Sequence, residues 1–295
     1  MAQIMRIGLW LAQLCSSKTA WRLAGVMAWL MQVTNSDLAR INRINIQACF
    51  AHLDAHEQEA MCRLSLRHLA LLVFEFAQLA HWPDDKLLGQ IVEVEGLELL
   101  EAAIESKQGV LLMVPHFGNW EVLCAFLGKH YALAALYDPP KIASLEPVMV
   151  AARQRYEAQM FPIDTGGIRS LIKVLRSGSL VAILPDQVPD RSAGVHADFF
   201  GRPALSMTLS HRLISKNQPC VLMGSVTRLL NDKGYSYRVC FEKGPAAGAT
   251  DLDTATSINA AIEKIVRRAP EQYQWEYKRF KRPPEEAPDN IYRRQ

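Results

Sequence analysis

The stretch VLLMVPHFGNWE, residues 110–121, decides the fold. Its first half, VLLMV at residues 110–114, is a short apolar run bounded by Gly109 and Pro115, which is typical of a strand buried on both faces of a parallel sheet. A helical pattern follows over residues 121–129. The stretch therefore predicts a strand, a tight turn that carries polar residues, and a helix.

The same alternation of apolar runs and helical patterns continues toward the C-terminus. Short apolar runs at residues 132–137, 160–163, 180–184 and 220–226 alternate with helical patterns at residues 145–159, 167–176 and 206–216. Strands that alternate with helices of this length need crossover connections, so they predict an α/β fold with a mostly parallel sheet flanked by helices. The turn residues 231–234 and the alternating residues 235–242 predict an antiparallel hairpin at one edge of the sheet, and residues 253–268 predict a last helix.

Upstream of this stretch the sequence is mainly helical. Residues 37–82 show apolar positions at spacings of three and four without Gly or Pro, then residues 91–95 alternate as a strand does, and residues 97–106 return to a helical pattern. We divide the chain accordingly into a membrane-anchoring or interfacial helix at 1–36, a helical N-terminal region at 37–90, and an α/β domain at 91–295.

Residues 1–36 contain no acidic residue. They hold Trp10, Trp21 and Trp29 together with Lys18 and Arg22, a composition that indicates contact with an anionic membrane. A single helix over residues 7–33 crosses a bilayer only by burying both cations, at about 2.5 to 3.5 kcal/mol each, so we favour an interfacial helix over a full span. A helix folded onto its own domain is the remaining alternative.

The overall composition narrows the class of protein. The chain has 295 residues, of which 49% are hydrophobic and 21% charged, with a net charge of +3. The composition excludes a disordered chain, and the net charge gives no case for nucleic-acid binding. A polytopic membrane protein is excluded because no uninterrupted apolar stretch approaches the ~18 to 20 residues that span a bilayer. The six scattered cysteines have no metal-site or redox spacing and predict reduced, packed thiols.

His116 and Glu121 are the candidate catalytic residues, because they follow a buried strand and ligands bind at the carboxyl ends of parallel strands. On one helix the two would point about 140° apart. They can meet only if His116 lies in the turn, Asn119 caps the helix and Glu121 occupies its first turn. We then expect the carboxylate to accept a hydrogen bond from the imidazole, which makes His116 a general base for a hydroxyl. No nucleophile elbow, P-loop or dinucleotide motif is present, and Cys124 is interpreted as a structural thiol.

Several motifs carry a resemblance to a known family. VPHFGNWE, residues 114–121, resembles the His-x4-Asp/Glu block of glycerolipid-type acyltransferases, and in its NWE form that of the lipid A secondary acyltransferases of Gram-negative bacteria, the lauroyl and myristoyl transferases. The resemblance continues through NRINIQACF at 42–50, ILPDQ at 183–187, ADFFGRPA at 197–204 and APEQYQWEYKRFKRPP at 269–284, so it covers nearly the whole chain.

The resemblance implies a glycerol-3-phosphate acyltransferase-like fold and a fatty acyl transfer in lipopolysaccharide biosynthesis. The donor would be an acyl-carrier-protein thioester and the acceptor a hydroxyl of a lipid A precursor of the Kdo2-lipid IVA type, at the cytoplasmic face of the bacterial inner membrane. No cofactor and no metal are implied. His116 would deprotonate the hydroxyl and Glu121 would orient His116.

The resemblance also suggests further site residues. Asn119 or backbone N–H groups at the helix start are candidate oxyanion donors. Asp186 and Gln187 would lie near His116 at the same sheet edge, and Arg169 and Arg202 are candidates for a phosphate. The family often has Tyr-Arg-Pro where this chain has YDP at 137–139, so Arg153 or Arg155 is a candidate for the missing arginine. The basic run at 278–282 would face anionic lipid or the acidic carrier protein.

Two other functions remain open at this level. The acceptor could be another membrane lipid, such as a lysophospholipid or a glycolipid, or the chain could be a non-catalytic lipid-binding protein. The second alternative has no need of a base, and the His116/Glu121 pair argues against it. Neither the motifs nor the composition determines the acyl chain length, the acceptor position or the oligomeric state. They also do not distinguish an acyl-CoA donor from a carrier-protein donor.

Overall fold

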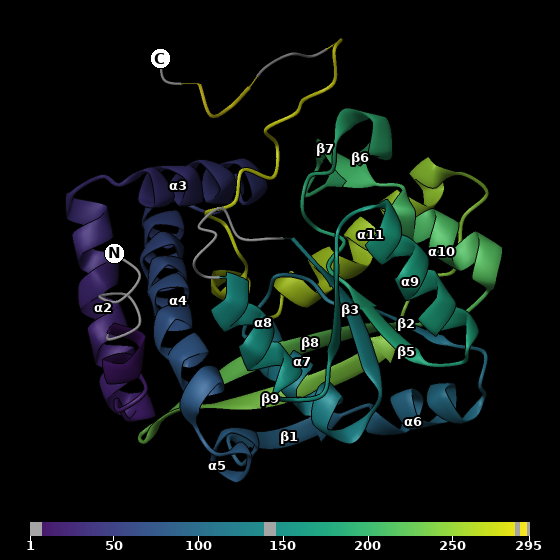
Figure 1. The fold of residues 1–295 in the computed structure, drawn as a ribbon. Coiled ribbons are helices and arrows are strands. Elements are labelled where there is room, and N and C mark those ends of the chain that lie inside the picture. The colour runs from purple at the N-terminus through teal and green to yellow at the C-terminus, as the bar shows by residue number, and fades with distance from the viewer. Residues whose placement is uncertain (1–7, 139–145, 287–289, 294–295) are drawn as a thin grey trace.

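A seven-stranded sheet forms the centre of the molecule (Figure 1). The computed structural model describes residues 8–138, 146–286 and 290–293, and within 146–149 it describes the backbone only. The strand order is β1-β9-β8-β2-β5-β3-β4. The strands are β1 (Ile91–Glu95), β2 (Val110–Met113), β3 (Leu133–Tyr137), β4 (Gln159–Pro162), β5 (Leu180–Ile183), β8 (Cys220–Asn231) and β9 (Gly234–Lys243).

The sheet is mostly parallel, as predicted. Strand β2 pairs in parallel with β5 and β8, and β3 pairs in parallel with β5 and β4. Strands β8 and β9 form the predicted antiparallel hairpin. Its predicted place at the edge is wrong, because β1 pairs with β9 and takes the outer position. The outward backbone groups of β9 are thereby hydrogen-bonded rather than left open.

Helices cover both faces of the sheet (Figure 1). Leu111 and Met113 of β2 pack with α9, α10 and α11, whereas Val110 and Leu112 pack with α2, α4, α6 and α7. This burial on both faces explains the continuous apolar run that the sequence shows at β2. The helices are α2 (Ser17–Val33), α3 (Asp37–Cys49), α4 (Ala55–His81), α5 (Asp84–Leu88), α6 (Leu97–Glu105), α7 (Trp120–His130), α8 (Glu146–Gln154), α9 (Thr165–Arg176), α10 (Leu209–Asn217) and α11 (Asp251–Val266).

The N-terminal segment is not one continuous helix. Residues 8–12 are helical, a turn follows, and α2 begins after Ser16, whose side chain accepts a hydrogen bond from the Thr19 N–H. Ala20, Ala24 and Ala28 are buried along α2, which packs against α4. In the described part of the chain, no helix is both long and apolar enough to cross a membrane. The predicted single helix over 7–33 is therefore wrong across its described residues, and a membrane-spanning helix is not supported.

The structure contains a two-stranded hairpin that the sequence analysis did not predict. Strands β6 (Gly194–Phe199) and β7 (Arg202–Met207) form a separate antiparallel sheet. The helix expected from residue 206 starts only at Leu209, because Ser206 and Met207 still pair with β6. The helix expected over 145–159 ends at Gln154 as α8, and residue 145 lies outside the described residues.

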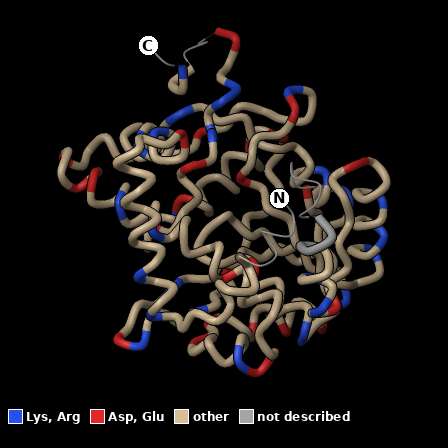
Figure 2. Tube along the Cα trace, turned by 60° about the vertical axis from the view of Figure 1, so that its left-hand side comes forward, with Lys and Arg blue, Asp and Glu red and all other residues tan. Residues whose placement is uncertain are grey.

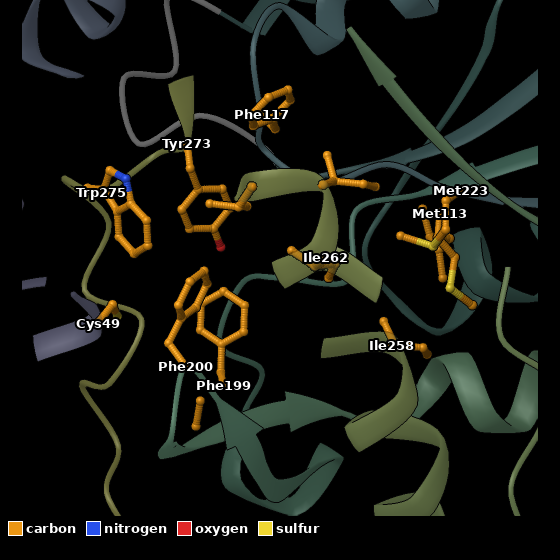
Figure 3. Close-up of a cluster of buried hydrophobic side chains, with 14 of the residues drawn as sticks. Cys49, Met113, Phe117, Phe199, Phe200, Met223, Ile258, Ile262, Tyr273 and Trp275 are labelled. Atoms are coloured by element: carbon orange, nitrogen blue, oxygen red, sulfur yellow. The ribbon is translucent and has the colours of Figure 1, made fainter. Parts of the chain in front are cut away.

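An aromatic cluster joins this hairpin to the turn after β2 (Figure 3). Phe199 and Phe200 of the hairpin, whose ring centroids are 4.9 Å apart, lie beside Tyr273 and Trp275 of the C-terminal segment. Phe117 of the turn forms an isolated antiparallel bridge with Tyr273. Aromatic packing of this kind stabilises by burial and ring geometry together. The C-terminal segment is thereby held directly against the turn that carries His116.

Charged residues of both signs lie around the outside of the chain trace (Figure 2). The basic run at 278–282, which we expected to face anionic lipid or the carrier protein, is only partly exposed. Arg279 is buried and donates to the Leu205 carbonyl and the Ser206 hydroxyl, and Arg282 pairs with Asp190. The run serves mainly to attach the C-terminal segment to the hairpin and to the loop after β5.

Candidate active site

His116 lies at the carboxyl edge of the sheet, immediately beyond β2, and its nearest carboxylate is Asp186. The His116 backbone N–H donates to Asp186 Oδ2 at 2.8 Å, and imidazole Nδ1 lies 2.7 Å from Asp186 Oδ1. Asp186 follows β5, the parallel neighbour of β2, so both residues come to the same edge of the sheet. The predicted proximity of Asp186 and Gln187 to His116 is confirmed.

The contacts of the imidazole define its tautomer. Burial opposes ionisation of Asp186, but the charge of His116 and the hydrogen bonds from it outweigh this effect and lower the pKa of the carboxyl group. An ionised Asp186 accepts from Nδ1–H and leaves a lone pair on Nε2, which lies 3.1 Å from the Gln187 amide nitrogen. Trp120 packs edge-on against the imidazole at 4.9 Å between centroids. His116 is thus held as a base with its accepting nitrogen on the Gln187 side.

Glu121 does not orient His116, and this part of the prediction is wrong. Both carboxylate oxygens of Glu121 are bound by Arg153 of α8, at 3.0 Å from Nε and 2.5 Å from Nη2. Burial opposes ionisation, yet Arg153 and then His116 lower the pKa of Glu121 by their charges. Glu121 therefore contributes a negative charge beside the imidazole, whereas Asp186 makes the direct contact. The reason is geometric: in the first turn of α7, Glu121 faces α8.

Asn119 caps α7, as predicted. Its side-chain oxygen accepts from the Val122 N–H at 3.3 Å, and its amide nitrogen donates to the Tyr237 hydroxyl at 3.2 Å. The residue is only 2% exposed. Since these contacts occupy both ends of the amide, the backbone N–H groups of the first turn of α7 are the better candidates for stabilising an oxyanion.

Gly118 makes the close approach of this turn to β8 possible. Its φ is +58°, and a Cβ there would lie 1.6 Å from the Val226 carbonyl oxygen, so the backbone position excludes any side chain. The Gly118 N–H donates to the Gln272 carbonyl at 2.9 Å. The turn is therefore fixed from two sides, by β8 and by the C-terminal segment.

A buried ion pair supports the site from behind. Arg228 of β8 binds both carboxylate oxygens of Glu75 of α4 at 2.6 Å, and each side chain is 1% exposed. Glu75 also accepts from Tyr237, which in turn accepts from Asn119. Charges at this depth persist only when paired and hydrogen-bonded. The network ties α4 through the sheet to the cap of α7.

The other predicted arginines lie elsewhere. Arg153, offered as a substrate contact, instead pairs with Glu121. Arg155 donates to the Trp82 carbonyl and pairs with Asp84, which places it near α5. Arg202 lies over the Phe280 ring, and Arg169 is exposed on α9. The structure brings none of these last three to His116 by a direct contact.

The predicted membrane residues lie on the N-terminal segment in different surroundings. Trp10 and Trp29 are exposed, as are Lys18 and Arg22. Trp21 instead packs within the protein: the Arg67 guanidinium lies 3.8 Å from its ring centroid, and His68 is at 5.1 Å. The Trp21 ring therefore contacts α4, and its predicted role as a membrane contact is not supported.

Three residues near the site were not predicted as site residues, because no local spacing in the sequence indicates that role. Burial and the charge of Asp186 raise the pKa of Tyr273, and buried Arg279 lowers that of Asp186. Glu276 lines a small cavity behind Trp120, together with His68 and Arg228. Burial raises the pKa of Glu276 to about 7, and its buried Oε1 has no hydrogen-bond partner among the residues that the structure describes. All three residues belong to the motif at 269–284, but only the tertiary structure shows that this segment lies near His116.

The remaining groups of chemical interest are the Cys124 thiol and the potential metal ligands. Burial raises the pKa of Cys124 to about 12, so the thiol is a poor nucleophile. Within the described ranges, no cluster of three or more His, Cys, Asp and Glu side chains is arranged to hold a metal ion.

Comparisons with known proteins show which sequences this chain resembles. A family whose description is bacterial lipid A biosynthesis acyltransferase matches residues 2–282. The chain is 29% identical over 245 residues to the lipid A biosynthesis palmitoleoyltransferase of Escherichia coli K12, covering 83% of this chain and 79% of that protein. It is 26% identical over 258 residues to the lauroyltransferase of the same organism, covering 86% and 82%. A phosphatidylinositol mannoside acyltransferase of Mycobacterium tuberculosis is 28% identical over 179 residues, covering 59% of this chain and 54% of that protein.

Proposed function

The chain belongs to the family of bacterial lipid A biosynthesis acyltransferases, and on that basis we propose that it transfers a fatty acyl chain from an acyl-carrier-protein thioester to a hydroxyl of a lipid A precursor of the Kdo2-lipid IVA type. The observation that carries the chemistry is the His116–Asp186 pair. It offers an imidazole with a defined tautomer and an accepting Nε2 at the sheet edge where ligands bind.

The reaction needs a base, an aligned thioester and a stabilised oxyanion. The substrate hydroxyl replaces the Gln187 amide at His116 Nε2 and gives up its proton there, while its oxygen attacks the thioester carbonyl. The tetrahedral intermediate then collapses with loss of the thiolate, which takes the proton from His116. An ester C–O bond forms, a C–S bond breaks, and the imidazole is regenerated.

Surrounding charges favour the protonated imidazole during this reaction. Asp186 stabilises it through Nδ1, and the ionised Glu121 adds a second negative charge nearby. The helix start at Asn119 presents the first-turn N–H groups of α7 toward the developing oxyanion. Arg153 keeps Glu121 in place, so Glu121 and Arg153 act as positioning residues.

We further propose that α2 holds the enzyme at the cytoplasmic face of the inner membrane. Leu23, Val26, Leu30 and Val33 are exposed and lie on one stripe of α2, opposite its buried alanines. Lys18 and Arg22 border this stripe and suit anionic headgroups. An interfacial helix of this kind needs no membrane span.

Two measurements test the acyl transfer. Mass spectrometry of lipid A from cells with and without the gene should show the loss of one secondary acyl chain. With purified enzyme, His116→Ala and Asp186→Asn should each lower kcat by about 10²- to 10⁴-fold while the fold is retained. Cys124→Ala is the matched control and should keep nearly full activity. An unchanged lipid A profile, or full activity of His116→Ala, contradicts the proposal.

A second acceptor class rests on one of the relatives. The mycobacterial relative is named a phosphatidylinositol mannoside acyltransferase, and that name indicates a different acceptor. A glycosylated phospholipid is therefore the alternative acceptor for the same His116 chemistry. Assays with both acceptors, using the same thioester donor, separate the two.

A further inference from the structure

Two neighbouring helices carry a group of exposed cations that the catalytic site does not use. Helix α9 contains Arg169, Lys173 and Arg176, and α10 contains Arg212 and Lys216, all of them exposed. Neither helix contains Asp or Glu. We call these five residues the α9–α10 basic face.

The five side chains form a continuous surface rather than scattered charges. Arg169, Lys173 and Arg176 are spaced by four and three residues, and Arg212 and Lys216 by four, so each set lies along one stripe of its helix. The C-terminal ends of the two helices are joined where Arg176 Nε donates to Asn217 Oδ1 at 2.8 Å. The two stripes therefore add their fields over one region of the surface.

The charges on this face are not neutralised from within the protein. Among the residues that the structure describes, none of the five takes part in an ion pair, whereas cations on other elements, such as Arg238, Arg268 and Arg282, do. The carboxylate nearest in sequence, Asp164, is used to cap α9 through the Gly167 N–H. An unpaired basic surface of this kind attracts an anionic partner over a Debye length of about 8 to 10 Å.

The position of the face indicates which partner fits. Helix α9 begins just after β4, at the edge of the sheet where His116 and Asp186 lie, and runs back toward the amino ends of the strands, so Arg169 is the residue of α9 in this face that lies nearest the catalytic edge. Helices α9 and α10 lie on the opposite side of the molecule from α2 (Figure 1). When the apolar stripe of α2 meets a membrane, the α9–α10 basic face points away from the lipid and toward the aqueous phase.

We propose that the α9–α10 basic face docks an acidic protein, and that this protein is the soluble carrier that delivers the acyl thioester. The second half of this inference rests on the proposed function. A partner bound there does not compete with the membrane for the same surface, and its affinity comes largely from long-range charge attraction.

The proposal is tested by reversing three of these charges and measuring the steady-state kinetics with two different acyl donors. In the variant Lys173→Glu/Arg212→Glu/Lys216→Glu, the KM for a carrier-linked acyl thioester should rise by about tenfold or more at low salt. Both kcat and the KM for the same acyl group on free pantetheine should stay unchanged, because that donor lacks the acidic protein. For the wild type, raising the salt concentration should raise the carrier KM in the same direction.

A matched reversal on other surfaces controls for net charge. Arg63→Glu/Lys233→Glu/Lys243→Glu changes the same number of exposed cations, and it should leave the carrier KM unchanged. An unchanged carrier KM in the α9–α10 variant, or an equal rise in the control variant, overturns the docking site.

Direct binding separates this proposal from the proposed function. Wild-type enzyme and both variants are titrated with acyl-free carrier protein and with vesicles containing phosphatidylglycerol. Carrier binding that is lost only in the α9–α10 variant supports the docking site even if no acyl transfer is found. Loss of vesicle binding with carrier binding intact overturns it and assigns the face to lipid.

Discussion

Single residues determine the protonation chemistry of this site. Asp186, ionised despite its burial, holds His116 in the tautomer that leaves Nε2 free to accept a proton. Glu276, in the cavity that Trp120 also lines, has the opposite tendency, because burial raises its pKa to about 7. The two carboxyl groups thus differ because the charge of His116 and its hydrogen bonds outweigh burial at Asp186, whereas burial outweighs the hydrogen bonds at Glu276.

Glu276 should make stability depend on pH. Its pKa is raised to about 7 in the folded state from 4.5, so the native protein binds more protons than the unfolded chain between these values, and stability falls as the pH rises from 4.5 to 7. The loss is on the order of 1 to 3 kcal/mol. Glu276→Gln should flatten this part of the curve, measured by urea unfolding at several pH values. A variant with an unchanged slope would show that other groups cause it.

At the scale of elements, polar pairs fix the helices to the sheet and to each other. The Glu75–Arg228 pair joins α4 to β8, and the Glu121–Arg153 pair joins α7 to α8. The second pair lies beside His116, so it couples the packing of α8 to the geometry of the catalytic turn. A helix that is distant in sequence thereby influences the position of the base.

Breaking the Glu121–Arg153 pair should therefore cost stability as well as activity. Glu121→Ala leaves the Arg153 cation largely buried without its partner, and we expect a loss of roughly 2 to 4 kcal/mol in the free energy of unfolding. The double variant Glu121→Ala/Arg153→Ala should recover part of this loss without recovering full transfer. Chemical denaturation measures the free energy of unfolding, and steady-state kinetics measures acyl transfer. If Glu121→Ala is as stable as the wild type, the pair does not hold α7 to α8.

At the scale of the whole molecule, distinct surfaces are separated around one sheet. Helix α2 lies at one side and helices α9 and α10 lie at the other, with the sheet between them (Figure 1). Under the proposed function, this arrangement would let a lipid acceptor and a soluble donor bind on different sides of the molecule.

The α2 stripe should determine membrane binding. Replacing three of its exposed residues, in Leu23→Gln/Val26→Gln/Leu30→Gln, keeps helix-compatible side chains but removes apolar surface, so partition onto anionic vesicles should fall by about tenfold or more. The control Val92→Gln/Leu230→Gln/Leu252→Gln changes exposed apolar residues on other elements and should bind as the wild type does. Vesicle flotation measures both. Equal binding of the α2 variant and the wild type would remove α2 as the anchor.

The sequence by itself determined the alternation of strands and helices, the turn at 115–119, the Asn119 cap and the family resemblance. These features depend on local periodicity, on Gly and Pro, and on motifs read along the chain. Only the tertiary structure decided which carboxylate binds His116. Spacing along the chain favoured Glu121, five residues away, but α7 turns Glu121 toward Arg153, whereas the parallel pairing of β2 with β5 brings Asp186 to the imidazole. For the same reason Arg279 and Arg282 of the basic run at 278–282 are bound within the protein, because contacts across 70 or more residues are set by packing, which no local pattern encodes.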